Sequence, residues 1–301
     1  MKIAVAASPD VAIPTLEYLL NSKYELALVI SRPDSQVGRG REMAPTAVSS
    51  WATNHGIDLY CPNQAVDFDD RLKEIDLVIT IGYGLLLPES LLAQPRYGFI
   101  NLHFSLLPRL RGAAPVQRAI IEGLTETGIT VFQLDAGMDT GPIYVQTKYA
   151  IQPNTTAGEL LSELALLGPA AIEQTIIAIA NGTKPVLQNH DQATLAPKLT
   201  KTEAQINWTT SAVEVINRIL GFSPNPGATT KFRGKVLRIT KAKQSEVVLP
   251  IGQISLNEGS VLVGTALNSV ELLEVTPAGK KAMSAADWAN GARFTPGELL
   301  E

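Results

Sequence analysis

Short apolar runs alternate with helical patterns along the first half of the chain. The apolar runs have the length and composition of strands and cover residues 2–7, 24–31, 75–82 and 97–102. Segments with the periodicity of helices lie between these runs. The first predicted helix starts at Ser8 and Pro9 and extends to about Leu20. Strands that are apolar on both faces and alternate with helices form sheets covered on both sides. The pattern therefore predicts an α/β domain with an open, doubly wound, mostly parallel sheet.

The pattern changes twice further along the chain. Residues 128–134 and 142–150 predict an antiparallel pair of edge strands, and residues 155–180 predict a helix that bends at Gly168 and Pro169. Periodicity is then lost where the chain gains polar residues and prolines, as is typical of a linker. We therefore predict a first domain, a linker and a second domain at residues 1–183, 184–207 and 208–301.

The second domain differs in kind from the first. A short helix at 211–220 precedes several strand-like segments separated by glycine turns, at residues 228–233, 235–242, 259–266 and 269–276. Many short strands within about 95 residues are typical of small barrels. We therefore expect a small β-barrel similar to the oligonucleotide-binding (OB) type.

Composition narrows the class of protein. Cys61 is the only cysteine, so no disulfide closes within the chain and no multi-cysteine zinc site forms. The amino terminus is strand-like rather than a signal peptide, and no apolar run approaches the roughly 18 residues of a membrane span. We therefore expect a cytoplasmic protein, with no metal site and no membrane partner.

Charge is distributed unevenly along the chain. The whole chain carries a formal net charge of −4, whereas residues 198–243 contain nine lysines and arginines against two acids. The negative total argues against a general nucleic-acid-binding protein, and we expect no DNA partner. The basic segment, which includes Lys201, Lys231 and Arg233, is either a solvated face or a docking surface for phosphates. Charge alone favours the solvated face.

Chemistry-bearing side chains gather where the strand at 97–102 ends. Asn101 and His103 lie two residues apart, so on a strand both side chains point to one face while Leu102 turns into the core. Asparagine supplies amide donors, and histidine supplies a donor or a cation near neutral pH. A site is therefore expected at the carboxyl edge of the sheet. The other two histidines, His55 and His190, are expected to be surface caps.

These residues belong to a longer motif. Asn-x-His-x-Ser-Leu-Leu-Pro from Asn101 to Pro108, an Arg-Gly pair after it, and Asp139-Thr140-Gly141 resemble the formyltransferases that use 10-formyltetrahydrofolate. The resemblance implies that Asn101, His103 and Asp139 are catalytic, although Asp139 alone could simply cap a turn. It also implies that two segments hold the pterin of the folate: Gly82, Tyr83, Gly84 and Leu85, and Ser105, Leu106, Leu107 and Pro108. Taken alone, the first segment is compatible with an ordinary strand-to-helix turn.

A second resemblance is more specific. The polar loop at residues 32–45 carries Arg32, Arg39 and Arg41 and is expected to have little regular structure. By itself it is read as a connection, but it is similar to the segment of methionyl-tRNA formyltransferases that enters the acceptor stem of initiator tRNA. Residues 222–228 and the stretch from 279 to 297 resemble the carboxyl-terminal domain of that family. The resemblance implies that initiator methionyl-tRNA is bound by the three loop arginines together with Lys201, Lys231 and Arg233.

The implied reaction moves a formyl group from folate N10 to the α-amine of methionine on initiator tRNA. Asn101 and His103 would donate hydrogen bonds to the oxyanion, where one donor is typically worth about 2.7–4 kcal/mol. Asp139 would orient His103 and relay a proton. Three alternatives stay open: an amino-sugar formyltransferase, a hydrolase of formylfolate, and an RNA-binding module with a degenerate enzyme domain. A monomer is expected.

Overall fold

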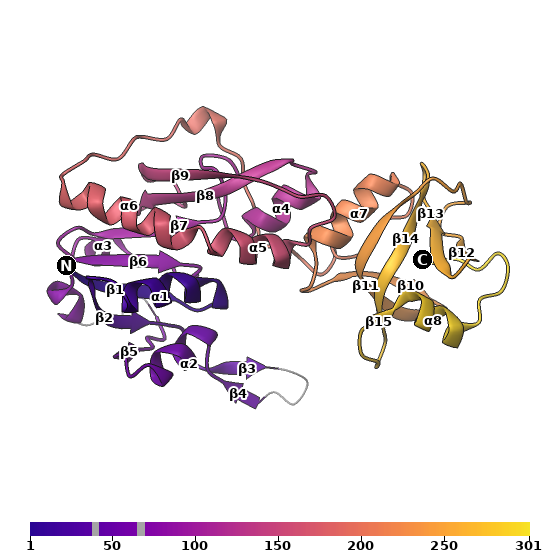
Figure 1. Ribbon diagram of the computed structural model, residues 1–301, viewed down its shortest axis with the longest axis horizontal. Coiled ribbons are helices and arrows are strands. Elements are labelled where there is room, and N and C mark those ends of the chain that lie inside the picture. Colours follow the sequence, from indigo (N-terminus) through magenta and orange to yellow (C-terminus); the bar gives the residue numbers. More distant parts are fainter. Residues whose placement is uncertain (38–41, 65–69) are drawn as a thin grey trace. The chain divides into compact units, whose positions relative to one another are not determined.

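The computed structural model describes residues 1–37, 42–64 and 70–301 (Figure 1). It divides the chain into two compact units. The first unit comprises Met1–Ala113, Thr127–Tyr149 and Leu161–Ala196. The second comprises Ala114–Glu126, Ala150–Leu160 and Pro197–Glu301. Neither unit is a single continuous range of the sequence, because Ala114–Glu126 and Ala150–Leu160 pack with the second unit.

The first unit is built on a seven-stranded sheet with the order β5-β2-β1-β6-β7-β8-β9. The first five of these strands are parallel, and β8 runs antiparallel to β7. The strands are β1 (Lys2–Ala7), β2 (Glu25–Ile30), β5 (Leu59–Tyr60), β6 (Leu77–Ile81), β7 (Phe99–His103), β8 (Glu126–Gln133) and β9 (Ile143–Ala150). The mostly parallel sheet that the apolar runs predict is confirmed, with the strands close to their predicted positions.

Helices and buried side chains cover both faces of this sheet. On one face, Ala4, Ala6 and Phe99 share a core with Leu72 of the 3-10 helix η3 (Asp70–Glu74) and Leu91 of α3 (Glu89–Leu92). The opposite face is covered by elements that include α1 (Ile13–Leu20), α2 (Ala47–Asn54) and α6 (Gly168–Ala180). The helix expected from Ser8 begins instead with a 3-10 turn, η1 (Asp10–Ala12), whose N-cap residue Pro9 makes no side-chain cap hydrogen bond.

The long apolar helix predicted at 155–180 is two helices. α5 (Ala157–Ala165) and α6 meet at a bend of 41°, so the predicted break at Gly168 is confirmed. Glycine is required there, because a Cβ on Gly168 would lie 2.8 Å from both Leu102 Cδ2 and Thr15 Oγ1. Within the described residues, no single helix is long and apolar enough to cross a membrane, although this bent pair passes by length and composition.

The arginine-bearing loop contains regular structure, contrary to the expectation from sequence. β3 (Ser35–Val37) and β4 (Glu42–Ala44) pair antiparallel, with Gln36 opposite Met43. Strands of three residues are too short to show an alternating pattern, so the sequence does not predict them. Arg39 and Arg41 lie outside the described residues.

The second unit contains an antiparallel sheet with the order β10-β11-β14-β13-β12, and β15 pairs with β14. Its strands are β10 (Ala228–Phe232), β11 (Lys235–Ser245), β12 (Ile254–Asn257), β13 (Ser260–Gly264), β14 (Ser269–Pro277) and β15 (Met283–Ser284). Its helices include α4 (Pro115–Ile121), α7 (Ala212–Gly221) and α8 (Ala285–Ala292). A carboxyl-terminal antiparallel β domain is therefore present. Among the residues that the structure describes, no pairing joins β10 directly to β12, so this sheet is open.

Candidate functional site

The candidate site lies at the carboxyl ends of β6 and β7. In the sheet, β2 lies on one side of β1 and β6 lies on the other, so the order of the strands reverses beside β1. Open α/β sheets bind ligands at such a reversal of strand order. Gly82 and Gly84 follow β6 with φ of +57° and +75° and are exposed. Between them Tyr83 turns into the core, where burial raises its pKa to about 12. Only the backbone of Tyr83 is therefore available to a ligand.

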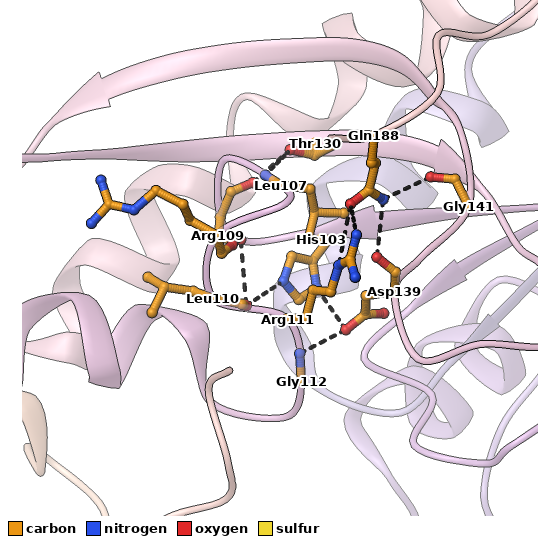
Figure 2. A network of polar contacts seen from close by, with 11 residues as sticks. His103, Leu107, Arg109, Leu110, Arg111, Gly112, Thr130, Asp139, Gly141 and Gln188 are labelled. Atoms are coloured by element: carbon orange, nitrogen blue, oxygen red, sulfur yellow. Dashed lines mark hydrogen bonds and ion pairs between the residues drawn. The ribbon is translucent and has the colours of Figure 1, made fainter. Parts of the chain in front are cut away.

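His103 and Asp139 face each other (Figure 2). His103 Nδ1 lies 3.7 Å from Asp139 Oδ2, and Nε2 lies 3.0 Å from the carbonyl oxygen of Leu110. A carbonyl only accepts, so Nε2 carries a hydrogen and Nδ1 is turned toward the carboxylate. The backbone N–H of Gly112 donates to Asp139 Oδ2 at 2.7 Å. The structure thus brings together two of the three predicted catalytic residues, and it buries the imidazole to 6% exposure.

Asn101 lies on the same face of β7. Thr80 of β6 pairs with Asn101, whereas Leu102 packs toward Gly168 of α6 on the other face, as the alternation along the strand predicts. Asn101 is half-buried. Within the described part of the chain, its side-chain amide has no hydrogen-bond partner. The amide is therefore free to bind a ligand.

The loop after β7 is held by hydrogen bonds from the neighbouring strands. Thr130 Oγ1 of β8 donates to the Ser105 carbonyl at 2.6 Å and accepts the Leu107 N–H at 3.1 Å. Gln146 Nε2 of β9 donates to the Leu107 carbonyl at 2.7 Å. The backbone of Leu107 is therefore engaged within the protein. Leu106 and Pro108 are half-buried, so this loop offers a ligand mainly apolar side-chain contacts.

Two polar residues of the site, Gln188 and Thr194, are not predicted from the sequence. Gln188 lies in the aperiodic segment that reads as a linker, and its side chain is 6% exposed. It accepts from the buried guanidinium of Arg111 and donates to the backbone carbonyls of Asp139 and Gly141 (Figure 2). Thr194 accepts the N–H of Leu110 at 2.9 Å. Arg111 has a signal, since it is the arginine of the Arg-Gly pair, but nothing in the local sequence singles out Gln188 or Thr194.

The other two histidines have different outcomes. His55 is the C-cap of α2, so its expected place at a helix end is confirmed. His190 begins the 3-10 helix η4 (His190–Gln192), and its Nδ1 lies 3.0 Å from Arg111 Nη2. Arginine only donates, so His190 accepts this bond with an unprotonated Nδ1. It is therefore a partner of a buried cation as well as a surface residue.

The candidate phosphate-binding residues differ in their pairing. Arg32 of the first unit is exposed, as are Lys201 and Lys231 of the second. Arg233 makes two hydrogen bonds to the Glu298 carboxylate, at 2.7 and 3.0 Å. These bonds raise the pKa of Arg233 and lower that of Glu298 to about 2. Arg233 is therefore partly neutralised, in contrast to the two lysines, for which no ion pair is found among the described residues.

The described residues contain no group of three or more histidine, cysteine, aspartate or glutamate side chains placed to hold a metal ion. The polar groups at the site are instead an amide, an imidazole and one carboxylate. Such a set can donate hydrogen bonds to an oxygen that gains negative charge and can transfer a proton.

Two family profiles together match most of the chain. The profile of the formyl transferase family matches residues 1–176, and that of the formyl transferase carboxyl-terminal domain matches residues 198–293. The methionyl-tRNA formyltransferase of Thermobifida fusca is 43% identical over 305 residues, covering 99% of this chain and 98% of the relative. That of Streptomyces coelicolor is 42% identical over 308 residues, covering 100% and 99%.

Solved structures share the fold at lower identity. The N-formyltransferase from Helicobacter canadensis, in complex with folinic acid and dTDP-3-aminofucose, has a TM-score of 0.70 and 20% identity, covering 90% of this chain and 98% of that one. The methionyl-tRNA formyltransferase from Clostridium thermocellum has a TM-score of 0.58 and 15% identity, covering 91% and 99%. At these identities the likeness establishes the fold alone.

Proposed function

The chain belongs to the methionyl-tRNA formyltransferase family, and from this we infer that it transfers the formyl group of 10-formyltetrahydrofolate to the α-amine of methionine on initiator tRNA. The product is the formylated methionyl-tRNA used to begin translation. The observation that carries the inference is full-length similarity at 43% identity. The pair formed by His103 and Asp139, beside the free amide of Asn101, supplies the chemistry that the reaction needs.

We propose that Asn101 and His103 stabilise the oxygen of the formyl group as the amine attacks its carbon. Asn101 supports this role because its amide is free at the carboxyl edge of the sheet. His103 Nε2 donates to the Leu110 carbonyl in this structure, so its proposed role requires that this hydrogen bond be exchanged for one to the formyl oxygen. Preorganised donors of this kind are worth about 2.7–4 kcal/mol each in the transition state.

Asp139 is proposed to hold His103 in register and to assist proton movement. Its carboxylate is fixed by the Gly112 N–H and faces His103 Nδ1. The carboxylate in that position can hold the orientation of the imidazole while the substrate is polarised. The attacking amine loses a proton as its bond to the formyl carbon forms. Asp139, the carboxylate that faces His103, can relay this proton through water to N10 as the bond between N10 and the formyl carbon breaks.

The residues proposed to hold the folate fit a flat, partly apolar donor. Gly82 and Gly84 leave the backbone bare between β6 and α3, so Gly82, Tyr83, Gly84 and Leu85 are proposed to contact the ring through backbone groups. Ser105, Leu106, Leu107 and Pro108 are proposed to form the facing wall. Since the Leu107 backbone is engaged by Thr130 and Gln146, this wall contributes through the Leu106 and Pro108 side chains.

Initiator methionyl-tRNA is proposed to contact Arg32, Arg39 and Arg41 in the first unit and Lys201, Lys231 and Arg233 in the second.

An OB-like barrel is proposed for the second domain. In its support, Leu300 bridges to Phe232 of β10 and Leu299 to Gln253 beside β12, so the last residues link the two edges of the sheet. The domain ranges 1–183 and 208–301 with linker 184–207, a monomeric state, a cytoplasmic location and the lack of DNA, membrane and metal partners are likewise proposals.

The test is formyl transfer from 10-formyltetrahydrofolate to three acceptors: methionine-charged initiator tRNA, methionine-charged elongator tRNA and an amino-sugar nucleotide. Turnover confined to the initiator is expected. Turnover with the sugar alone would indicate an amino-sugar formyltransferase, and release of formate without an acceptor would indicate a hydrolase. Binding of tRNA with no turnover would indicate an RNA-binding module.

A further inference from the structure

The segment at residues 185–196, here called the strap, is part of the active site rather than a simple connection. Val186 pairs with Ile143 through two backbone hydrogen bonds of 2.7 and 2.8 Å, which fixes the start of the strap to β9. Near its end, Ala196 N–H donates to the Arg111 carbonyl at 2.6 Å, and Arg111 N–H donates to the Thr194 carbonyl at 2.8 Å. Between these two anchors the strap passes the loops that carry the catalytic residues.

Gln188 is the central residue of the strap (Figure 2). Its Oε1 accepts from Arg111 Nε at 3.2 Å and Nη2 at 2.6 Å. Its Nε2 donates to the Asp139 carbonyl at 3.0 Å and the Gly141 carbonyl at 2.7 Å. An amide has two donor hydrogens and two acceptor lone pairs, so all four positions are used. A buried amide with every position filled holds its partners in one arrangement.

The two carbonyls that Gln188 binds flank the turn that presents the Asp139 carboxylate. Asp139 has a φ of +54°, a conformation that a side-chain-bearing residue keeps only when its surroundings hold it. Gln188 fixes this turn from the backbone side, and the Gly112 N–H fixes the carboxylate itself. Removing the amide would take the Gln188 hydrogen bond from the buried Gly141 carbonyl and from the partly buried Asp139 carbonyl, and would leave His190 as the remaining side-chain partner of Arg111.

The strap also reaches His103 from the other side. Thr194 Oγ1 accepts the Leu110 N–H, and the Leu110 carbonyl accepts from His103 Nε2. Leu110 itself has a φ of +59°, so it too is in a left-handed turn that its neighbours must hold. The strap therefore contacts the support of both members of the catalytic pair, Asp139 through Gln188 and His103 through Thr194.

We propose that Gln188 is a positioning residue for formyl transfer, acting through the turn that aims Asp139 at His103. The proposal rests on the proposed function, because it concerns the rate of that reaction. Gln188 does not touch the reacting atoms. Its effect therefore belongs to kcat rather than to the binding of either substrate.

The experiment compares Gln188→Met with Gln192→Met in the full-length protein. Methionine keeps the length of the side chain and removes all four hydrogen bonds, and Gln192 is an exposed glutamine of the same strap. Misplacement of a catalytic group by about 1 Å costs about 100-fold in rate, so Gln188→Met is expected to lower kcat by about that factor with KM for both substrates unchanged. Gln192→Met is expected to match the wild type. A Gln188→Met enzyme with a wild-type kcat would overturn the proposal.

A double variant separates positioning from a general structural effect. If Gln188 acts through Asp139, then adding Gln188→Met to Asp139→Asn should cause almost no further loss of kcat, because the group being positioned is already disabled. Losses that multiply would overturn the proposal. Gln188→Glu keeps an acceptor for Arg111 but cannot donate to the carbonyls, so it is expected to be as slow as Gln188→Met. Full activity of Gln188→Glu would show that the carbonyl contacts do not matter.

Folding is checked by thermal melting of each variant. If Gln188→Met does not fold, Gln188→Glu and Thr194→Val carry the test, since each removes contacts on one side of the catalytic pair and keeps the side-chain volume. Normal kcat in Gln188→Glu would overturn the inference. A wild-type chain that is inactive with initiator methionyl-tRNA would instead overturn the proposed function. An active wild type with normal variants overturns only the positioning role.

Discussion

Asp139 combines a left-handed backbone with a partly buried carboxylate, at 15% side-chain exposure. A non-glycine residue in that region typically costs about 1–3 kcal/mol, although aspartate is among the residues that tolerate it best. The Gly112 N–H offsets part of this cost by binding the carboxylate. The conformation is therefore held by the Gly112 N–H on the carboxylate and the Gln188 amide on the Asp139 carbonyl, at a residue that we propose to be catalytic.

At the residue scale, Asp139→Asn should keep the fold and lose the rate. The amide oxygen can still accept the Gly112 N–H, but the charge that faces His103 Nδ1 is gone. Positioned acid–base groups typically contribute about 100- to 10,000-fold, so single-turnover formyl transfer should slow by at least about 100-fold with tRNA affinity unchanged. His103→Ala and Asp139→Ala should lose most of the rate too. Near-wild-type transfer in any of the three would remove that residue from the mechanism.

Asn101→Ala tests the proposed oxyanion donor separately. The described chain offers this amide no hydrogen-bond partner, so its removal leaves no group unsatisfied and the melting temperature should not change. Loss of one such donor costs about 100- to 1,000-fold in kcat. Asn54→Ala, an exposed residue at the end of α2, is the matched control and should retain full turnover. A change in KM for the folate with normal kcat would assign Asn101 to binding instead.

At the scale of elements, α7 shows how the sequence specifies a helix start. Ser211 Oγ accepts the N–H of Glu214, and the Glu214 carboxylate accepts the N–H of Ser211, which is a capping box. Replacing a serine N-cap by alanine costs about 1 kcal/mol. Ser211→Ala should therefore lower the free energy of unfolding by about that amount in urea titrations. Ser90→Ala, at an exposed position within α3, should have no measurable effect, and equal stability of the two variants would refute the cap's contribution.

Three glutamates make the stability of the second unit sensitive to acid. Hydrogen bonds from Thr156 and Lys241 lower the pKa of Glu159 to about 2, those from Arg118 and Thr200 do the same for Glu203, and those from Arg233 and Thr295 for Glu298. A carboxyl whose pKa is depressed on folding stabilises the fold above its unfolded pKa, about 4.5, and loses that contribution as pH falls toward 2.

Unfolding of the second unit should accordingly become easier between pH 4.5 and 2. The variant that replaces all three glutamates by glutamine should lose stability at neutral pH and show a flatter dependence in that interval. The measurement is urea unfolding at stepwise pH, followed by the fluorescence of Trp208 and Trp288, which both lie in this unit. Glu258→Gln, at an exposed position, serves as the control. An unchanged slope in the triple variant would mean that other groups govern acid unfolding.

The elements that repeat a pattern could be predicted from the sequence, whereas those that depend on distant partners could not. The parallel strands are largely apolar, so β1, β6 and β7 could be predicted, and alternation placed Asn101 and His103 on one face. Asp139 could be found only by resemblance, since a turn aspartate has many uses. Gln188 could not be found, because its partners lie 47 to 77 residues away in the sequence. The β3–β4 hairpin is too short to leave a pattern.

At the scale of the whole molecule, positive charge is concentrated in residues 198–243, which include three of the residues proposed to contact tRNA. Of the nine basic residues in 198–243, Arg233, Lys241 and Lys243 pair with glutamates, and Lys201 and Lys231 remain exposed. Each cation that contacts a phosphate releases a counterion, so binding weakens as salt increases. The unpaired lysines should therefore carry more of the affinity for tRNA than the arginine.

Salt titration of KM for initiator methionyl-tRNA tests this ranking. Lys201→Ala and Lys231→Ala should each raise KM and reduce the slope of log KM against log salt by about 1. Arg233→Ala should change the slope less, because Glu298 already neutralises its charge. KM for 10-formyltetrahydrofolate should be the same in all three. Identical slopes in every variant would mean that this basic surface faces solvent during the reaction.

The division into units also limits how this protein can exchange parts with its relatives. The chain crosses between the units five times, after residues 113, 126, 149, 160 and 196. Gly221 of α7 lies so close to α4 that a Cβ on it would come within 2.5 Å of Ile121. A gene fusion joined at a single point in the linker would therefore bring a foreign α7 against a resident α4. Successful chimaeras should need residues 114–126 from the same parent as residues 197–301.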